Sequence, residues 1–302
     1  MAATTISPAP ARTANFTRFA WGVLGWNLLV VLWGAFVRAS GSGAGCGSHW
    51  PLCNGEVVPL APRIETIIEF THRMMSGVSL VAVAALWLWS RRSFSHGDRA
   101  RKMALASVAF LITEALLGAG LVLFNYVDKD QSVGRAFYLS LHLANTLLLL
   151  AALALTAWYS RGAASTPGRR SRLVLAALPI ALVVCVTGAI AALGDTLYPA
   201  ASLTEGFRQD LSGASSLLLR LRVLHPVFAV LGALYFAGAS IAVLRTSHSR
   251  LAIYVLILTL TQLSAGALNV ILLAPVWMQI THLLLADLVW IALVLLAVEA
   301  RT

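Results

Sequence analysis

The sequence contains 302 residues, of which 59% are hydrophobic and only 11% are charged, and its mean hydropathy is +0.82. These values exclude a soluble globular domain and indicate an integral membrane protein. The net charge of +10 does not point to nucleic acid as a partner, because the chain lacks the basic and aromatic pattern typical of nucleic-acid binding.

The chain begins with a polar stretch, residues 1–16, which we expect to be disordered. Beyond it, eight apolar segments are long enough to cross a membrane, for which roughly 20 residues are needed. The first segment is too long for a signal peptide and lacks the small-residue cleavage pattern, so we expect it to remain as a span. The eight predicted spans cover residues 17–38, 65–90, 103–125, 136–160, 171–193, 217–244, 250–273 and 276–298.

The basic residues between these spans and near their ends are distributed unevenly between the two sides of the membrane. One side carries Arg12, Arg18, Arg91, Arg92, Arg99, Arg101, Lys102, Arg161, Arg169, Arg170, Arg172, Arg245, Arg250 and Arg301. The other side has fewer, and acidic residues balance them: Arg38, Arg63, Lys129, Arg135, Arg208, Arg220 and Arg222, with Glu56, Asp128, Asp130, Asp195, Glu205 and Asp210. The positive-inside rule therefore predicts a multi-pass protein of the cell membrane with both chain ends in the cytoplasm.

The second half of the chain repeats the first half weakly but in order. The segment "GAFV" in the first span corresponds to "GAIA" in the fifth, and "TEALLGAG" in the third corresponds to "TQLSAGAL" in the seventh. A duplicated unit of four spans explains this order. We therefore predict an all-α integral membrane protein whose eight transmembrane helices form two pseudo-symmetric four-helix bundles, over residues 1–160 and 161–302.

Four of the seven histidines fall within spans, one in each even-numbered span and at similar depth: His72, His142, His225 and His282. A single histidine in a span is often only a hydrogen-bonding group at a helix interface. Four at matched depth instead favour axial ligands of b-type heme, because the apolar porphyrin suits the core of a four-helix bundle. Pairing within each repeat joins His72 to His142, and His225 to His282. A zinc site is the weaker alternative, because few cysteines and carboxylates lie in the spans.

The two halves differ in the charged residue that precedes the first histidine of each pair. Glu69 precedes His72 by three residues, and Arg222 precedes His225 by three, so each lies on the same helix face as its histidine. An arginine beside a heme is a natural partner for a propionate. Propionates repel a carboxylate, so we predict a chemical role for Glu69: moving a proton, or stabilising positive charge on a carbon at the porphyrin edge.

Other charged residues of the spans allow more than one interpretation. Arg73 can pair with a heme propionate or form an ion pair with Glu69 at the i, i+4 spacing. Glu114, whose counterpart in the second half is Gln262, and Asp287 are interpreted as structural or proton-path residues.

The loop between the first two spans carries Cys46 and Cys53 among several glycines. On the outer side of the membrane disulfides persist, so a Cys46–Cys53 disulfide is our main expectation. Two free thiols that cycle with a redox partner are an alternative. A c-type heme is disfavoured, because no Cys-x-x-Cys-His motif occurs. We expect this loop, with His49 and Trp50, to form a lid over the bundle that contains Glu69.

Taken together, these motifs are similar to those of the heme A synthase family of bacterial and mitochondrial inner membranes. The similarity rests on a first span ending in "GAFVRASGSGAGC", the loop "CGSHWPLCNG", the segment "EFTHRMMSG" and one histidine in each even-numbered span. It covers essentially all eight predicted spans. Some relatives have a second cysteine pair between the fifth and sixth spans, but residues 194–216 contain no cysteine here, so a thiol relay between two loops is not implied.

The resemblance implies an oxidoreductase that converts the C8 methyl group of heme O to the formyl group of heme A, by two hydroxylations followed by loss of water. It implies a resident heme b in the C-terminal half, ligated by His225 and His282. The substrate heme would lie between His72 and His142 in the N-terminal half, with Glu69 acting on the methyl carbon or on the attacking water. Cys46 and Cys53 match a functionally important outer disulfide of the family.

Two other functions remain open on the residues alone. The first is a di-heme b electron carrier, such as a quinone oxidoreductase, in which both hemes are permanent. The second is a conduit or chaperone that binds heme without changing it. The pathway implied by the resemblance adds membrane lipid, the enzyme that makes heme O and the assembly of a terminal oxidase as partners, and it is compatible with a homo-oligomer.

Overall fold

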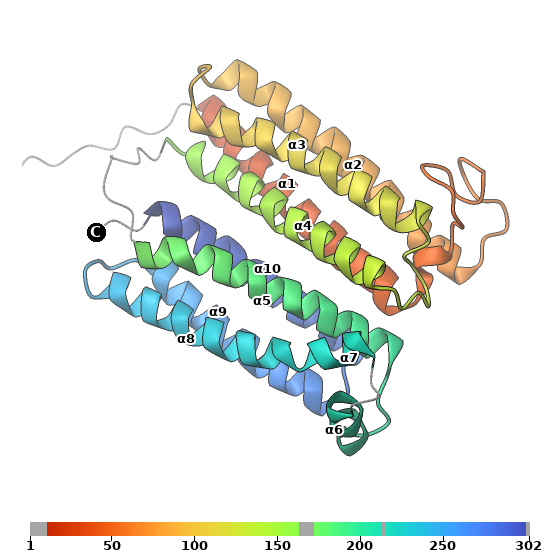
Figure 1. Cartoon of the computed structure of the whole chain (residues 1–302). Coiled ribbons are helices and arrows are strands. Elements are labelled where there is room, and N and C mark those ends of the chain that lie inside the picture. The colour runs from red at the N-terminus through yellow and green to blue at the C-terminus, as the bar shows by residue number, and fades with distance from the viewer. Residues whose placement is uncertain (1–10, 163–171, 213–215, 300–302) are drawn as a thin grey trace, which may run out of the picture.

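The computed structural model describes residues 11–162, 172–212 and 216–299, and helices dominate it (Figure 1). The long helices are α1 (Ala11–Ala39), α2 (Ile64–Ser93), α3 (Arg99–Leu123), α4 (Val133–Tyr159), α5 (Arg172–Leu197), α8 (Leu224–Leu244), α9 (Arg250–Ile271) and α10 (Val276–Glu299). Within the described residues, eight stretches are long and apolar enough to cross a membrane. The predicted all-α, multi-pass fold is confirmed.

The spans pack in two groups of four. In the first group α1 contacts α2 and α4, and α3 contacts the same two helices; in the second group α5 contacts α8 and α10, and α9 contacts the same two helices. The groups meet where α4 packs against α5 and α10, and where α1 packs against α10 (Figure 1). This arrangement is compatible with two pseudo-symmetric bundles, and the division at residue 160 stays a prediction.

The apolar core lies along the seam between the two groups. Leu147, Leu150 and Leu153, at helical spacing on α4, have no exposed surface. Trp290 of α10 is also buried, and its indole Nε1 donates a hydrogen bond to the carbonyl oxygen of Leu147 at 2.7 Å. Since α4 and α10 are covered by helices of both groups, they are the most buried spans, and they hold the second histidine of each predicted pair.

The sixth predicted span, residues 217–244, is confirmed as one apolar stretch, Leu218–Leu244, but it is built from two helices instead of one. A short helix, α7 (Leu217–Arg222), ends before Val223, and α8 begins directly after it. Pro226 explains the break, because it has no N–H to donate and its ring crowds the carbonyl group four residues earlier. His225 therefore lies in the first turn of α8.

The expectation about the start of the chain needs correction. Residues 11–16 were expected to be disordered, but they form the start of α1. Phe16 is fully buried, and the edge of its ring packs against Phe94 with ring centroids 5.0 Å apart. This contact explains why the helix begins before the apolar span.

A helix that the sequence analysis missed, α6 (Leu203–Leu211), follows α5. It starts at Ser202, whose hydroxyl accepts a hydrogen bond from the N–H of Glu205, as in a capping box.

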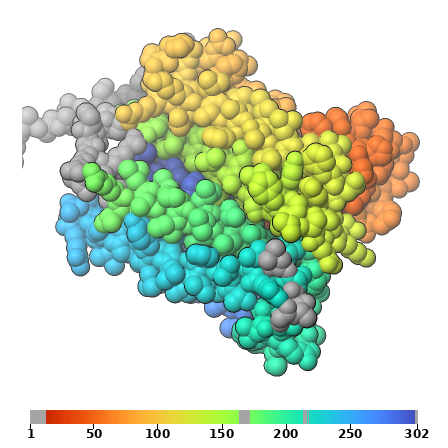
Figure 2. Space-filling view, in the orientation of Figure 1, coloured from red at the N-terminus to blue at the C-terminus, as the bar shows by residue number. Residues whose placement is uncertain are grey.

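The connections that carry the predicted outer loops lie at one end of the molecule. That end holds the loop between α1 and α2, the link from α3 to α4, and α6 (Figure 1). The opposite end holds the α2–α3 and α8–α9 links and the end of α10. The α1–α2 loop projects beyond the N-terminal group (Figure 2). Which end faces the cytoplasm stays a prediction, and what was expected of residues 1–10, Arg169, Arg170 and Arg301 lies outside the described residues.

Candidate functional site

Each of the four intramembrane histidines packs against a glycine of the preceding long helix. A Cβ atom added to Gly34 would lie 2.9 Å from Cε1 of His72, and one added to Gly188 would lie 3.0 Å from Cε1 of His225. The same holds for Gly266 with His282, again at 3.0 Å, and more loosely for Gly118 with His142, at 3.8 Å. Glycine therefore brings four imidazoles against four neighbouring backbones, two in each half.

In the C-terminal half, the two histidines face each other. The ring centroids of His225 and His282 are 6.3 Å apart, with planes at 82°. Thr187 Oγ1 lies 3.3 Å from His225 Nδ1, and Gln262 Nε2 lies 3.3 Å from His282 Nε2. His282 Nδ1 is buried and has no hydrogen-bond partner among the described residues. Two imidazoles at this separation fit one iron bound from both sides, since metal–imidazole bonds are about 2 Å long. We call the four glycines that receive the rings, Gly34, Gly118, Gly188 and Gly266, the glycine cradles.

In the N-terminal half, the histidines have different surroundings. His72 Nδ1 is buried, and no described residue forms a hydrogen bond with it. His142 Nδ1 lies 3.1 Å from a carboxylate oxygen of Glu114 on α3. Glu69, the acidic residue that the sequence singled out, lies on α2 one turn before His72.

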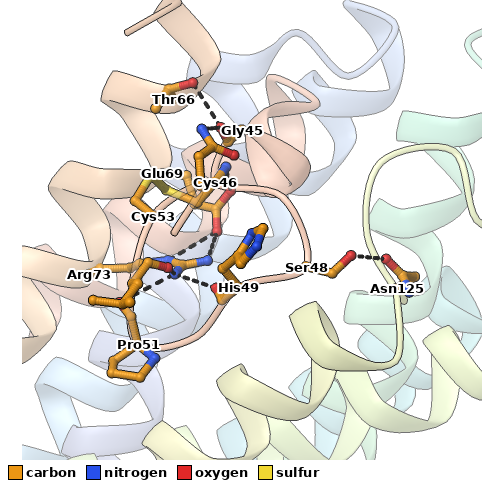
Figure 3. A network of polar contacts seen from close by, with 12 residues as sticks. Gly45, Cys46, Ser48, His49, Pro51, Cys53, Thr66, Glu69, Arg73 and Asn125 are labelled. Carbon is orange, nitrogen blue, oxygen red and sulfur yellow. Dashed lines mark hydrogen bonds and ion pairs between the residues drawn. A yellow bond between two sulfur atoms is a disulfide. The ribbon is translucent and has the colours of Figure 1, made fainter. Parts of the chain in front are cut away.

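Glu69 is almost fully buried, with 4% of its surface exposed, and it is held from two directions (Figure 3). The backbone N–H of Cys46 donates to its Oε2 at 2.8 Å. Arg73 donates to its Oε1 through Nη2 at 2.5 Å and through Nε at 3.1 Å. Of the two interpretations of Arg73, the structure shows the ion pair with Glu69; pairing with a propionate stays a prediction.

Arg73 also fastens the α1–α2 loop to the bundle. Its Nη1 donates to the carbonyl oxygens of His49 at 2.7 Å and of Leu52 at 2.6 Å (Figure 3). One guanidinium thus connects the carboxylate of Glu69 to the loop backbone. Because the loop supplies both the Cys46 N–H and these carbonyl groups, any movement of the loop would change the contacts of Glu69.

The loop is closed by a disulfide between Cys46 and Cys53, the first of the three alternatives considered for these residues. Thr66 Oγ1 donates to the carbonyl oxygen of Gly45 at 2.8 Å, and a side chain at Gly45 would overlap the backbone of α2. Ser48 Oγ donates to Asn125 at 2.7 Å, which links the loop to the end of α3 (Figure 3). The loop therefore lies against the N-terminal group at the end where Glu69 is found.

Arg222, the counterpart of Glu69, has two carboxylate partners that the sequence analysis did not assign. Its Nη1 lies 2.9 Å from Asp195 of α5, and its Nη2 lies 2.6 Å from Asp210 of α6. This guanidinium is held next to His225 by α5 and α6. The propionate contact predicted for Arg222 stays a prediction.

Arg38 is a site residue that the sequence analysis counted only as a loop charge. From the end of α1 it donates to the carbonyl oxygen of Ala192 at 2.8 Å and to Thr196 Oγ1 at 2.7 Å, both on α5, and to Gln279 Oε1 of α10 at 3.0 Å. Gln279 lies one turn before His282. Arg38 therefore connects the first group of helices to the residues beside the second histidine pair.

Asp287 is the most deeply buried acidic residue singled out by the sequence. It has no exposed surface, and neither carboxylate oxygen has a hydrogen-bond partner within the described part of the chain. It follows His282 by five residues, and its role as a structural or proton-path residue stays a prediction.

The chain is similar to proteins of heme metabolism. Residues 17–294 match the model of the COX15-CtaA family, described as "Cytochrome oxidase assembly protein". A "Protoheme IX farnesyltransferase" of Thermus thermophilus is 50% identical over 302 residues, which cover 97% of this chain and 49% of that protein. The chain thus spans about half the length of the first curated relatives that it matches.

Shorter matches carry a different name. A "Heme A synthase" of Shouchella clausii is 43% identical over 122 residues, 40% of each chain. A "Heme A synthase" of Halalkalibacterium halodurans is 48% identical over 99 residues, which cover 32% of this chain and 33% of that protein.

Proposed function

Since this chain belongs to the COX15-CtaA family of cytochrome oxidase assembly proteins, we propose that it is a heme A synthase, which oxidises the C8 methyl group of heme O to a formyl group. The observation that carries this proposal is the inequality of the two histidine pockets. Both are built from two even-numbered spans and two glycine cradles. The N-terminal pocket adds a buried carboxylate, Glu69, one turn before its first histidine and held by a disulfide-closed loop.

We assign the resident heme b to the C-terminal half, with His225 and His282 as axial ligands. The facing rings and the unpartnered Nδ1 of His282, among the residues described, support this assignment. A heme b bound there would supply one-electron redox chemistry. At the predicted outer end of this site, Arg222 pairs with Asp195 and Asp210, and a propionate would bind its guanidinium in place of one of these carboxylates.

We assign heme O to the N-terminal half, between His72 and His142. There Glu69 is positioned to take a proton from the attacking water, or to stabilise positive charge that develops on the methyl carbon. The Cys46 N–H and the Arg73 guanidinium fix the direction of its carboxylate. The loop covers this end of the N-terminal group and limits the access of water to the reacting carbon.

The names of the relatives support a reaction that modifies heme. The Thermus protein, named for heme farnesylation, is about twice as long as the part that this chain matches. We propose that a farnesylating enzyme supplies heme O and that assembly of a terminal oxidase uses the product. Both exchanges would take place in the cell membrane, with the chain ends in the cytoplasm, and the long farnesyl tail would lie along apolar helices or lipid.

Mass analysis of hemes extracted from cells that express this chain together with a heme O source tests the proposal. The wild-type chain is expected to yield heme A, and Glu69→Ala is expected to retain the C-terminal heme but yield no heme A. Glu65→Ala is the matched control, because Glu65 lies on the same helix but pairs with the exposed Arg63. If the wild-type chain yields only unmodified hemes, the di-heme carrier is favoured and the synthase is excluded.

A further inference from the structure

The residue that touches the second histidine of each pair differs between the halves. Glu114 on α3 lies with Oε1 3.1 Å from Nδ1 of His142. Its counterpart in the repeat, Gln262 on α9, lies with Nε2 3.3 Å from Nε2 of His282. The same place in the fold therefore holds an acid in the N-terminal half and a neutral amide in the C-terminal half, and each contacts a different ring nitrogen.

Glu114 is held in position by side chains that follow His142 on α4. Asn145 Nδ2 donates to Oε2 of Glu114 at 2.6 Å and to the carbonyl oxygen of Phe110 at 2.8 Å. Thr146 Oγ1 donates a short hydrogen bond to Oε1. The carboxylate is only 17% exposed. His142, Asn145 and Thr146 of α4 therefore all contact the carboxylate of Glu114. These contacts hold the carboxylate beside the imidazole.

The imidazole of His142 is confined on its other side as well. Gly118, one turn after Glu114 on α3, lets the ring approach to ordinary van der Waals contact, with Cε1 and Nε2 both 3.8 Å from the position of an added Cβ. The ring therefore lies along α3 between Glu114 at Nδ1 and Gly118 near Nε2. Nδ1 of His142 lies 3.1 Å from the carboxylate of Glu114 but is not aligned for a hydrogen bond with any described residue, so a proton there would need a small turn of the ring to reach the carboxylate. Nε2 is left as the nitrogen that would bind iron.

We propose that Glu114 is a positioning residue that makes His142 a more electron-donating ligand than His282, its counterpart in the other half. This rests on the proposed function, in which His142 flanks the iron of the substrate heme. A carboxylate that accepts the second ring N–H of a metal-bound histidine fixes its tautomer and increases its basicity. A more basic ligand stabilises ferric over ferrous iron, and a neutral amide such as Gln262 cannot match it.

The consequence concerns the direction of electron transfer. With Glu114 on one ligand, the heme in the N-terminal half has a lower reduction potential than it would with an amide there. An electron released at the substrate heme would therefore be transferred more readily to a heme held by His225 and His282, and from there to an external one-electron acceptor. In this proposal the residue roles are that Glu114 lowers the potential at His142 and that Gln262, a neutral amide, does not do so at His282.

Glu114→Gln tests this proposal, because it keeps the shape of the side chain and removes its charge. The probe is the purified holoprotein loaded with heme O, and the measurement is a potentiometric titration that resolves two hemes. The midpoint potential of one heme should rise by at least 59 mV, which corresponds to a tenfold change in the equilibrium constant for one-electron reduction. The ferric low-spin EPR signal of the same heme should change with it. The reciprocal Gln262→Glu should lower the other wave and leave the first in place.

A second measurement needs no bound heme. In protein labelled with ¹⁵N-histidine, the Nδ1–H of His142 should give a strongly deshielded proton signal that Glu114→Gln abolishes and Asp287→Asn leaves unchanged. Absence of that signal from the wild-type protein, or an unshifted pair of redox waves in Glu114→Gln, overturns the proposal. If the wild-type chain makes heme A while neither wave moves, the role of Glu114 alone is wrong; if the wave moves but no heme A forms, the proposed function is wrong.

Discussion

The N-terminal and C-terminal halves present their histidines in the same way and surround them in different ways. In both halves a glycine of one helix receives the imidazole of the next long helix. The N-terminal pocket adds Glu69 and Glu114, whereas the C-terminal pocket has Arg222 and Gln262 at the corresponding places. The two proposed heme sites therefore share one backbone scaffold, and the few charged residues that break the repeat are the features that would let only one half modify its heme.

The largest expected effect separates the two histidine pairs. His225→Ala or His282→Ala should remove the six-coordinate, low-spin absorbance of the resident heme and much of the bound heme, because only one axial ligand remains for its iron. His72→Ala or His142→Ala should leave that heme in place and abolish heme A formation. Absorbance spectra of the purified variants measure this, and His248→Ala, in the α8–α9 loop, is the control. Loss of the resident heme in His142→Ala would reverse our assignment of the halves.

A smaller effect is expected from the arginine that joins Glu69 to the loop. Arg73→Lys keeps the charge but cannot contact Glu69 and two loop carbonyl groups together. Hydrogen bonds to charged groups contribute about 1.5–3 kcal/mol, so heme A formation should fall by about 10- to 100-fold. Product yield by mass analysis is the measurement, with the exposed Arg63→Lys as a control. Full activity in Arg73→Lys would show that the loop does not position Glu69.

The glycine cradles give a graded comparison. Gly188→Ala and Gly266→Ala place a methyl group about 3 Å from a ligand ring, and such overpacking should weaken binding of the resident heme by roughly tenfold. Gly238→Ala on α8 meets no atom of the described residues within 4 Å and should have no effect. Gly118→Ala adds a methyl group 3.8 Å from His142, in the other half of the molecule, and should leave the resident heme unchanged. Equal affinity for the resident heme in all four variants would mean that these glycines do not determine the positions of the imidazole rings.

The smallest effect on the pockets is expected from the disulfide. Cys53→Ser removes the disulfide between two cysteines that are seven positions apart in the sequence. The free energy of unfolding should fall by about 2 kcal/mol, because the closed loop no longer restricts the unfolded chain. The resident heme should be unchanged, because the loop packs against the N-terminal group of helices. Thermal unfolding followed by heme absorbance and by circular dichroism measures both quantities. A loss of resident heme in this variant would contradict the separation of the halves.

The sequence was sufficient for features that depend on local spacing. Helical periodicity placed Glu69 beside His72, and hydrophobic length gave the eight spans. The break before His225 and the start of α6 also had local signals, Pro226 and the Ser202–Glu205 capping spacing, which the analysis did not use.

Contacts between distant segments could not be predicted. Arg38 meets α5 and α10 across 154 and 241 positions of sequence, and Asp195 and Asp210 are brought to Arg222 by the packing of α5 and α6. No local pattern specifies such partners, because they depend on how whole helices are arranged. The choice between the two interpretations of Arg73 likewise required the position of the loop.

An isotope chase tests the central claim most directly, namely that one half keeps its heme while the other turns its heme over. Protein purified with deuterium-labelled hemes in both halves would be supplied with unlabelled heme O under turnover conditions. We predict that the label held by His225 and His282 persists, and that the heme A formed is unlabelled once the N-terminal pocket has exchanged. Loss of label from both pockets at the same rate, or no exchange in either, would contradict this account.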